Sequence, residues 1–212
     1  MILLIDKPKG WTSFDVVAKV RGTLHEKKVG HGGTLDPNAT GLLIIGTGND
    51  TKKLDDITKN QNKTYEAEII LGATSTTDDV MGTITQTQRD SSATLRMTET
   101  EIKKLLKSFE GEQMQMPPQF SAIKINGKKS YDQARKGIEV KLTPRKVTIY
   151  SIKLIEYKYP LLKIICEVSS GTYIRSIARD LGGYLNELRR TKVGEYTVQK
   201  AINLSELPQL LK

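Results

Sequence analysis

The sequence predicts an α+β protein, because its strand and helix patterns are mixed without a regular βαβ repeat. Residues 63–71 alternate apolar and polar side chains, which is the pattern of a half-buried strand. Residues 98–109 are amphipathic and open with Thr98 and Glu101, the spacing of a helix capping box. The 212 residues suffice for one substantial domain, so we expect a single domain over residues 1–212.

The N-terminal third predicts short strands joined by helices. Residues 2–5 form an apolar strand pattern, and Thr12 or Ser13 can cap the helix that follows. The apolar run at 42–45 predicts a buried strand, and residues 51–57 predict a short helix. The apolar face expected for the first helix consists of Phe14, Val17, Ala18 and Val20.

The C-terminal half contains one segment of different character. Residues 112–142 combine Met, Pro and basic residues, and we expect them to form an insertion. Its Asn126-Gly127 pair predicts a hairpin turn, and residues 131–136 predict a short basic helix. The remaining elements, in order, are strands at 147–157 and 161–169, a helix at 172–185, a strand at 195–198 and a helix at 205–211.

The chain is basic, with 33 Lys and Arg against 24 Asp and Glu and a net charge of +9. Between residues 124 and 146, eight basic side chains accompany only two acidic ones. Such a segment is the electrostatic footprint of a polyanion partner and favours nucleic acid. A solvated, lysine-rich face has the same composition, so charge alone leaves both explanations open.

Residue counts exclude several classes of protein. No apolar run approaches the roughly 18 residues of a membrane span, and Asp6 interrupts the first apolar run too early for a secretion signal. The single cysteine, Cys166, rules out an internal disulfide and predicts a small buried side chain. We therefore expect a cytoplasmic protein without membrane contact.

The chemistry is expected to need neither metal nor cofactor. One cysteine and two histidines cannot assemble a thiolate-histidine metal cluster. The number of acidic residues does not exclude a magnesium site made of carboxylates, but no acidic cluster in the sequence indicates one. The sequence contains no Walker phosphate loop. It also lacks a dinucleotide-binding fingerprint, because Gly46-Thr47-Gly48 is not followed by a third glycine at the required spacing.

The most informative segment is the glycine-rich loop at 30–41. Asp36 precedes Pro37, which fixes a turn, and His31 lies five residues upstream. Glycines let a backbone approach a ligand closely, so the loop suits a carboxylate that is aimed at a substrate. An Asp-Pro turn whose carboxylate caps its own backbone is the more common origin of such a pattern.

Several separated segments, collinear over nearly the whole chain, resemble the motifs of the TruB-type tRNA pseudouridine synthases. The chain departs from the family pattern between Gly182 and Leu188, where it is several residues shorter. The segments that carry the resemblance are Lys7–Ser13, Gly30–Gly41, Lys63–Tyr65, Pro117–Gly137, Gly171–Ser176 and Leu188–Thr191.

The resemblance implies a pseudouridine synthase fold, with a central mixed, mostly antiparallel sheet flanked by helices. It makes residues 112–142 a thumb-like RNA-binding insertion. It implies that the protein isomerises uridine 55 in the T-loop of tRNA to pseudouridine, by base flipping and without a cofactor. Because the sequence ends at Lys212, we expect no C-terminal PUA-type domain.

The resemblance also assigns three catalytic residues and one supporting residue. Asp36 is the reacting carboxylate, as nucleophile or base. Arg175 is its expected cationic partner, and Asp79 is expected to order Arg175. Tyr65 is expected to stack on the flipped uracil and to help proton transfer at carbon 5. Without the resemblance, a phosphate contact for Arg175 and core packing for Tyr65 would be the ordinary interpretations.

Further positions of the family pattern are expected to bind substrate. Tyr173 and Leu188 would line the pocket, and Lys52 would lie near substrate phosphates. His31 is expected to contact RNA and fill the space of the flipped base, and not to act as acid or base. In the insertion, Lys124 and Arg135 are expected to bind tRNA.

Two other functions are compatible with this fold. One is an RNA-binding or RNA-chaperone module without turnover, and the other is the catalytic subunit of a guide-RNA ribonucleoprotein. The presence of Asp36, Tyr65 and Arg175 disfavours the first, and the short chain disfavours the second. We expect an isomerase that binds the tRNA T-arm, works as a monomer and needs no protein partner.

Overall fold

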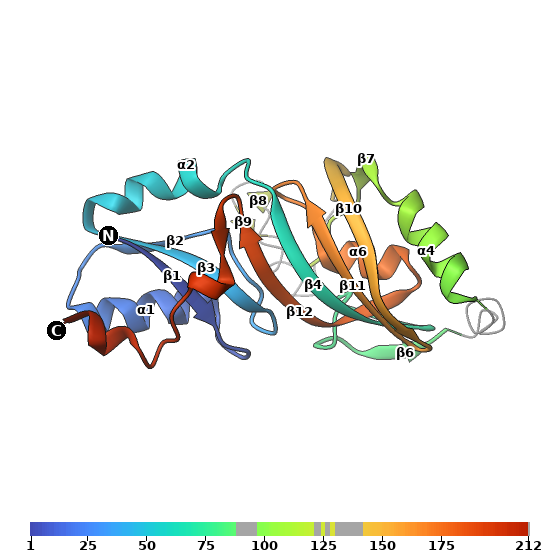
Figure 1. Cartoon of the computed structure of the whole chain (residues 1–212), viewed down its shortest axis with the longest axis horizontal. Coiled ribbons are helices and arrows are strands. Elements are labelled where there is room, and N and C mark those ends of the chain that lie inside the picture. The colour runs from blue at the N-terminus through green and yellow to red at the C-terminus, as the bar shows by residue number, and fades with distance from the viewer. Residues whose placement is uncertain (88–96, 121–123, 126–127, 130–141, 212) are drawn as a thin grey trace. The chain divides into compact units, whose positions relative to one another are not determined.

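The computed structural model describes residues 1–87, 97–120, 124–125, 128–129 and 142–211 (Figure 1). The chain divides into two compact units. Unit 1 consists of Met1–Glu66, Cys166–Ser170 and Glu187–Lys212, and unit 2 of Ala67–Ile165 and Gly171–Asn186. Three strands contribute residues to both units: β4 (Lys63–Leu71), β11 (Leu161–Val168) and β12 (Gly183–Val193).

The strands of unit 1 are arranged around β3 (Thr40–Thr47), which is buried along nearly its whole length. β3 pairs antiparallel with β1 (Ile2–Lys7) and with β2 (Val29–Gly32). It pairs parallel with β12, where Arg190 lies opposite Gly41. The remaining elements of unit 1 are α1 (Ser13–Leu24), η1 (Gly48–Lys53), α2 (Leu54–Thr58), β13 (Tyr196–Thr197), η2 (Val198–Lys200) and η3 (Leu207–Leu211).

Helix α1 begins as predicted, but its buried face is different. Thr12 is the N-cap, and its side chain and that of Asp15 form a capping box. In Figure 1, α1 and α2 lie below and above β2, and both contact it. The prediction was wrong for Phe14 and Ala18, which are exposed. The buried positions are Ser13, Val16, Val17 and Val20, which share one face at helical spacing.

In unit 2, the long strand β10 (Arg145–Lys158) lies between β11 and β7 (Gly111–Gln115). Helix α4 (Glu99–Ser108) packs on β10 and buries Ile102 and Leu106 (Figure 1). Its predicted capping box is confirmed. The other elements of unit 2 are β5 (Ala73–Ser75), β6 (Ile84–Gln86), β8 (Lys124–Ile125), β9 (Lys128–Lys129) and α6 (Ile174–Asp180).

The α+β class and the mixed, mostly antiparallel sheet are confirmed. The predicted strands at 2–5, 42–45, 63–71, 147–157 and 161–169 correspond to β1, β3, β4, β10 and β11. None of the helices in the described ranges combines the length and apolar content that a membrane span needs.

The prediction of one helix over 172–185 was wrong beyond Asp180. Gly182 adopts a φ of +84°, and a Cβ on Gly183 would come within 2.3 Å of the Ile70 carbonyl oxygen. Glycine alone accommodates that turn and that close approach, so the chain leaves α6 and continues as β12. Nearer the C-terminus, the predicted strand at 195–198 shortens to β13, and the predicted helix at 205–211 is the 3-10 helix η3.

The expected insertion at 112–142 begins inside the sheet, since residues 112–115 belong to β7. β8 and β9 pair antiparallel, with Ile125 opposite Lys128. The residues of the predicted hairpin turn, Asn126 and Gly127, lie outside the described residues. The predicted basic helix at 131–136 lies outside the described residues. The role of the insertion in RNA binding stays a prediction.

Candidate functional site

The loop that carries Asp36 joins β2 to β3, and we call residues 33–39 the Asp36 loop. The Leu35 N–H donates to Ser13 Oγ at 2.9 Å, and Ser13 Oγ lies 3.1 Å from the Leu35 carbonyl. The Asp36 carbonyl accepts from the Ala39 N–H at 3.0 Å, which closes a turn. These bonds fix the backbone on both sides of Asp36, which limits the positions that its side chain can take.

A buried lysine fixes the loop just after Asp36. The Pro37 carbonyl accepts from Lys7 Nζ at 3.2 Å and from the Gly10 N–H at 2.9 Å. Lys7 lies on β1 and is fully buried. The other two acceptors of its Nζ are the carbonyl oxygens of Pro8, at 2.9 Å, and Trp11, at 2.6 Å. Three carbonyls satisfy the three donors of an ammonium group.

Lys7 and Asp36 also interact through their charges. Burial lowers the pKa of Lys7 to about 8, and the charge of Arg190 lowers it too, whereas the charge of Asp36 raises it. Below pH 8 the ammonium group is therefore protonated. At neutral pH the ammonium and the carboxylate stabilise each other as opposite charges.

Tyr65 interacts with this loop through the charge of Asp36. It sits on β4 with 7% of its surface exposed. Burial raises the pKa of its hydroxyl, Arg190 lowers that pKa by its charge and by a side-chain hydrogen bond, and the charge of Asp36 raises it. Asp36, Tyr65 and Arg190, all residues of unit 1, are therefore linked through the electrostatics of the Tyr65 hydroxyl.

His31 is a neutral imidazole at neutral pH. It lies on β2, and burial, followed by the charge of Arg190, lowers its pKa. Its Nδ1 is buried and has no hydrogen-bond partner among the described residues. A neutral ring fits the expectation that His31 is no proton donor, and its contact with RNA stays a prediction.

The two other predicted substrate-binding residues of unit 1 are more open. Lys52 is exposed on η1. Leu188 is half-buried on β12, and its carbonyl lies 3.4 Å from Thr40 Oγ1 at the start of β3. Their contacts with tRNA stay predictions.

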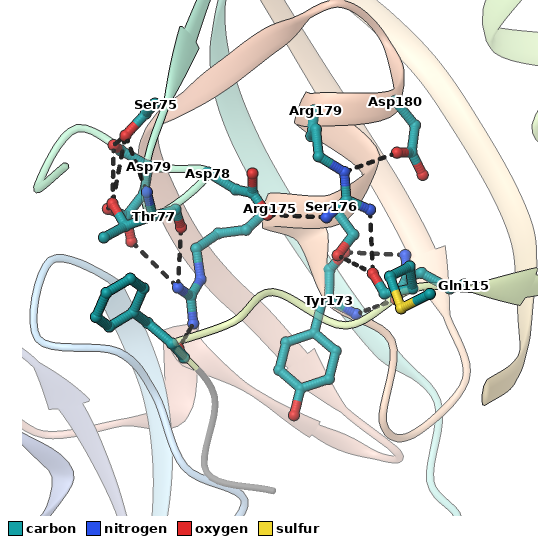
Figure 2. Close-up of polar contacts among 12 residues, drawn as sticks. Ser75, Thr77, Asp78, Asp79, Gln115, Tyr173, Arg175, Ser176, Arg179 and Asp180 are labelled. Carbon is teal, nitrogen blue, oxygen red and sulfur yellow. Dashed lines mark hydrogen bonds and ion pairs between the residues drawn. The ribbon is translucent and has the colours of Figure 1, made fainter. Parts of the chain in front are cut away.

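In unit 2, Arg175 on α6 is 5% exposed and holds two loops (Figure 2). Its guanidinium donates to the Thr77 carbonyl at 3.1 Å and to the Phe120 carbonyl at 2.9 Å. It also pairs with Asp79, at 3.6 Å between Arg175 Nη1 and Asp79 Oδ2. Asp79 is fixed in turn, because its Oδ1 accepts from Thr77 Oγ1 at 2.6 Å and from the Met81 N–H at 3.0 Å.

The start of α6 is joined to the segment that follows β7. The Gln115 side chain accepts from the Tyr173 N–H at 2.8 Å and donates to the Tyr173 carbonyl at 3.1 Å (Figure 2). Ser176 Oγ and Arg179 both donate to the Met116 carbonyl, at 2.9 Å and 3.0 Å. The helix that carries Arg175 therefore also fixes the beginning of the insertion.

The predicted site residues thus fall into two groups. Asp36, Tyr65, His31, Lys52 and Leu188 belong to unit 1, and Arg175, Tyr173 and Asp79 belong to unit 2. The expected pairing of Asp36 with Arg175 joins residues of different units and stays a prediction. The side chain of Lys124 and the whole of Arg135 lie outside what the structure describes.

Sequence reasoning did not give Lys7, Ser13 or Arg190 a role in the site. All three lie in the segments that carry the family resemblance, but a lysine, a serine and an arginine in such segments are no different in sequence from surface residues. Their importance comes from burial and contacts. In the part of the chain that the structure describes, no three His, Cys, Asp or Glu side chains are grouped as metal ligands would be.

Comparison with known proteins points to one family. A model of the N-terminal domain of the TruB family of pseudouridylate synthases matches residues 21–174. The tRNA pseudouridine synthase B of Corynebacterium diphtheriae is 47% identical over 98% of this chain and 72% of its own length. The enzyme of the same name from Ureaplasma urealyticum is 42% identical over 97% of this chain and 91% of its own length.

A solved structure agrees with the fold. A chain of a Cbf5-Nop10-Gar1 complex superposes with a TM-score of 0.74 and 28% sequence identity. The match covers 98% of this chain but 53% of that one, so this chain spans about half its length.

Proposed function

The chain belongs to the TruB family of pseudouridylate synthases, and from that membership we propose that it converts uridine 55 in the T-loop of tRNA to pseudouridine. The observation that carries the proposal is the Asp36 loop, whose backbone is bonded to Ser13 and Lys7 on either side of the carboxylate. The charge of Asp36 acts on the Tyr65 hydroxyl. The relatives at 42% and 47% identity are tRNA pseudouridine synthases B, which supports tRNA as the substrate.

The chemistry of the isomerisation matches the residues of unit 1. The bond between N1 of uracil and C1′ of ribose breaks, the base rotates, and a bond from C1′ to carbon 5 forms. Carbon 5 loses a proton and N1 gains one, so no electrons and no other group are exchanged. A carboxylate acting as nucleophile or base is the one reactive group that this step requires, and we assign that role to Asp36.

Uridine in a folded T-loop must leave its stack before Asp36 can reach it. We propose that Tyr65 stacks on the flipped base, with Tyr173 and Leu188 lining the pocket and His31 contacting the RNA. Base–aromatic stacking is worth on the order of 1–3 kcal/mol per base, which helps to offset the cost of unstacking. Lys52 and the basic insertion would bind phosphates.

We predict that Tyr65→Phe slows the reaction by roughly 100-fold or more, the usual cost of losing a group that transfers protons, and leaves tRNA affinity within about threefold. The ring that stacks on the base is retained, and only the hydroxyl is lost. Single-turnover rates and filter binding on an unmodified tRNA transcript measure the two quantities. Tyr196→Phe removes a hydroxyl elsewhere in unit 1 and should keep the wild-type rate. A wild-type rate for Tyr65→Phe would reduce Tyr65 to a packing role.

We predict that tRNA binding weakens steeply with salt. Each phosphate contact contributes about 0.7–0.9 to the slope of log affinity against log salt, so four lost contacts should lower that slope by about 3. The variant to compare with the wild type replaces Lys124, Lys128, Lys129 and Arg135 with glutamine.

The matched control for that measurement removes the same charge from the exposed lysines of α4 and β10. Replacing Lys103, Lys104, Lys107 and Lys153 with glutamine should leave the slope unchanged. Equal slopes in all three proteins, or a flat salt response in the wild type, would show that the insertion does not bind phosphates.

A second candidate function is the catalytic subunit of a guide-RNA ribonucleoprotein, which the likeness to a chain of the Cbf5-Nop10-Gar1 complex favours. We propose instead that the chain works alone, as a monomer in the cytoplasm. Purified protein should then modify tRNA without guide RNA or protein partners. Activity that appears only when such components are added would favour the second candidate, and binding without turnover would favour an RNA chaperone.

A further inference from the structure

Arg190 is the largest fully buried side chain among the described residues, with 1% of its surface exposed. Its backbone on β12 lies opposite Gly41 on β3. A Cβ on Gly41 would come within 2.3 Å of the Arg190 carbonyl oxygen, and Gly41 adopts a φ of +98°. Only glycine permits this approach, so Arg190 is brought against the strand that follows the Asp36 loop.

The guanidinium of Arg190 bonds to the first residue of the Asp36 loop and to the strand that follows the loop. Its Nε donates to the Leu42 carbonyl at 2.8 Å, and its Nη2 donates to the Gly33 carbonyl at 2.9 Å. Gly33 opens the loop, and Leu42 lies on β3 just beyond it. Because a guanidinium is planar and rigid, one group sets the separation of these two carbonyls.

The same guanidinium acts on Tyr65, because its charge and a side-chain hydrogen bond lower the pKa of the Tyr65 hydroxyl. A phenol oxygen that accepts a hydrogen bond still has its own hydrogen to donate. The side chain connects the loop of Asp36 to the hydroxyl of Tyr65 without requiring contact with substrate.

The positive charge of Arg190 is electrostatically unfavourable for the basic residues around it. Arg190 lowers the pKa of Lys7, Lys63 and His31, which means that it repels their protonated forms. Lys7 and Lys63 are themselves buried. A neutral side chain could fill the same space without this repulsion or the cost of burying a charge. An apolar residue, however, could not donate hydrogen bonds to the carbonyls of Gly33 and Leu42.

Resting on the proposed function, we propose that Arg190 is a positioning residue of the isomerisation, which holds Asp36 and Tyr65 at the separation that the reaction requires. It acts through the carbonyls of Gly33 and Leu42 and through the Tyr65 hydroxyl. Reacting groups displaced by about 1 Å can cost roughly 100-fold in rate, so a loosened loop should slow chemistry more than binding.

The test uses two variants of the whole chain. Arg190→Lys keeps the charge and loses the fork of donors. Gly33→Ala disturbs the same contact from the loop, because Gly33 has a φ of +71° and a Cβ there would lie 3.4 Å from Arg190 Nη1. The controls are Arg189→Lys, which removes another fork on β12, and Gly48→Ala, another glycine with positive φ.

Single-turnover rates at saturating protein, tRNA affinity and thermal melting are measured for each variant on an unmodified transcript. Both test variants should lower the rate by roughly 100-fold and leave affinity within about threefold, whereas both controls keep the rate. In a Tyr65→Phe background, Arg190→Lys should cost less than about tenfold, because part of its effect passes through the hydroxyl.

A purely structural role would lower the melting temperature of Arg190→Lys and leave the rate below that temperature unchanged. That result, or a wild-type rate in a folded Gly33→Ala, would overturn the inference and leave the proposed function standing. If Arg190→Lys does not fold, Gly33→Ala decides alone. An inactive wild-type chain would instead overturn the proposed function, and the inference with it.

Discussion

Replacing Asp36 with asparagine should abolish pseudouridine formation while the chain stays folded and binds tRNA. Asparagine has the size of aspartate, and the bonds that fix the loop use the backbone of Leu35 and Pro37. What the variant lacks is the negative charge and the reactive oxygen. Loss of the reactive group of an enzyme costs on the order of 10⁴-fold or more. Single-turnover formation of pseudouridine on an unmodified transcript measures the loss.

The matched control is Asp56→Asn on α2, which removes the same charge from an exposed position of unit 1. It should keep the rate and the tRNA affinity of the wild type. Circular dichroism and filter binding show whether Asp36→Asn is folded and binds. A folded Asp36→Asn that reacts at the wild-type rate would exclude Asp36 from the chemistry.

Replacing Arg175 with alanine should remove most of the turnover and also destabilise unit 2. The buried guanidinium satisfies the carbonyls of Thr77 and Phe120 and pairs with Asp79. Removing one partner of a buried pair costs about 3 kcal/mol or more, because the remaining charge stays buried. The loss of turnover follows from the expected role of Arg175 as the cation that serves Asp36. Steady-state rates below the melting temperature separate the two effects.

Two further variants of α6 sharpen that experiment. Arg175→Lys keeps the charge without the fork of donors, so it should fold better than the alanine variant and remain slow. Arg179→Ala, one turn further along, breaks the 3.0 Å ion pair with Asp78 and should lower stability while keeping turnover. Near wild-type turnover of Arg175→Ala would remove Arg175 from the mechanism.

The sequence predicted the fold where local patterns and packing agree. β4 has the predicted bounds, since its alternating side chains meet a core on one face. The capping boxes of α1 and α4 are likewise local signals. The helix predicted over 172–185 failed because Gly183 must pass the backbone of β4, a contact that no local pattern reveals.

The sequence was enough to predict which residues form the candidate site, but not which residues hold them in place. Asp36 and Tyr65 stand in motifs, and in the structure the charge of Asp36 raises the pKa of the Tyr65 hydroxyl. The groups that hold them, Lys7 and Arg190, are charged residues that a sequence places on the surface. Their burial follows from long-range pairing of β1 and β12 with β3, which tertiary structure alone determines.

The most direct test of the account is to map pseudouridine in an unmodified tRNA transcript after incubation with the purified chain alone. We predict a single pseudouridine, at position 55, formed without guide RNA, metal or cofactor. A transcript with cytidine at that position should stay unmodified. No pseudouridine, or pseudouridine at other positions while uridine 55 remains unchanged, would contradict the assignment of this chain as the synthase for that site.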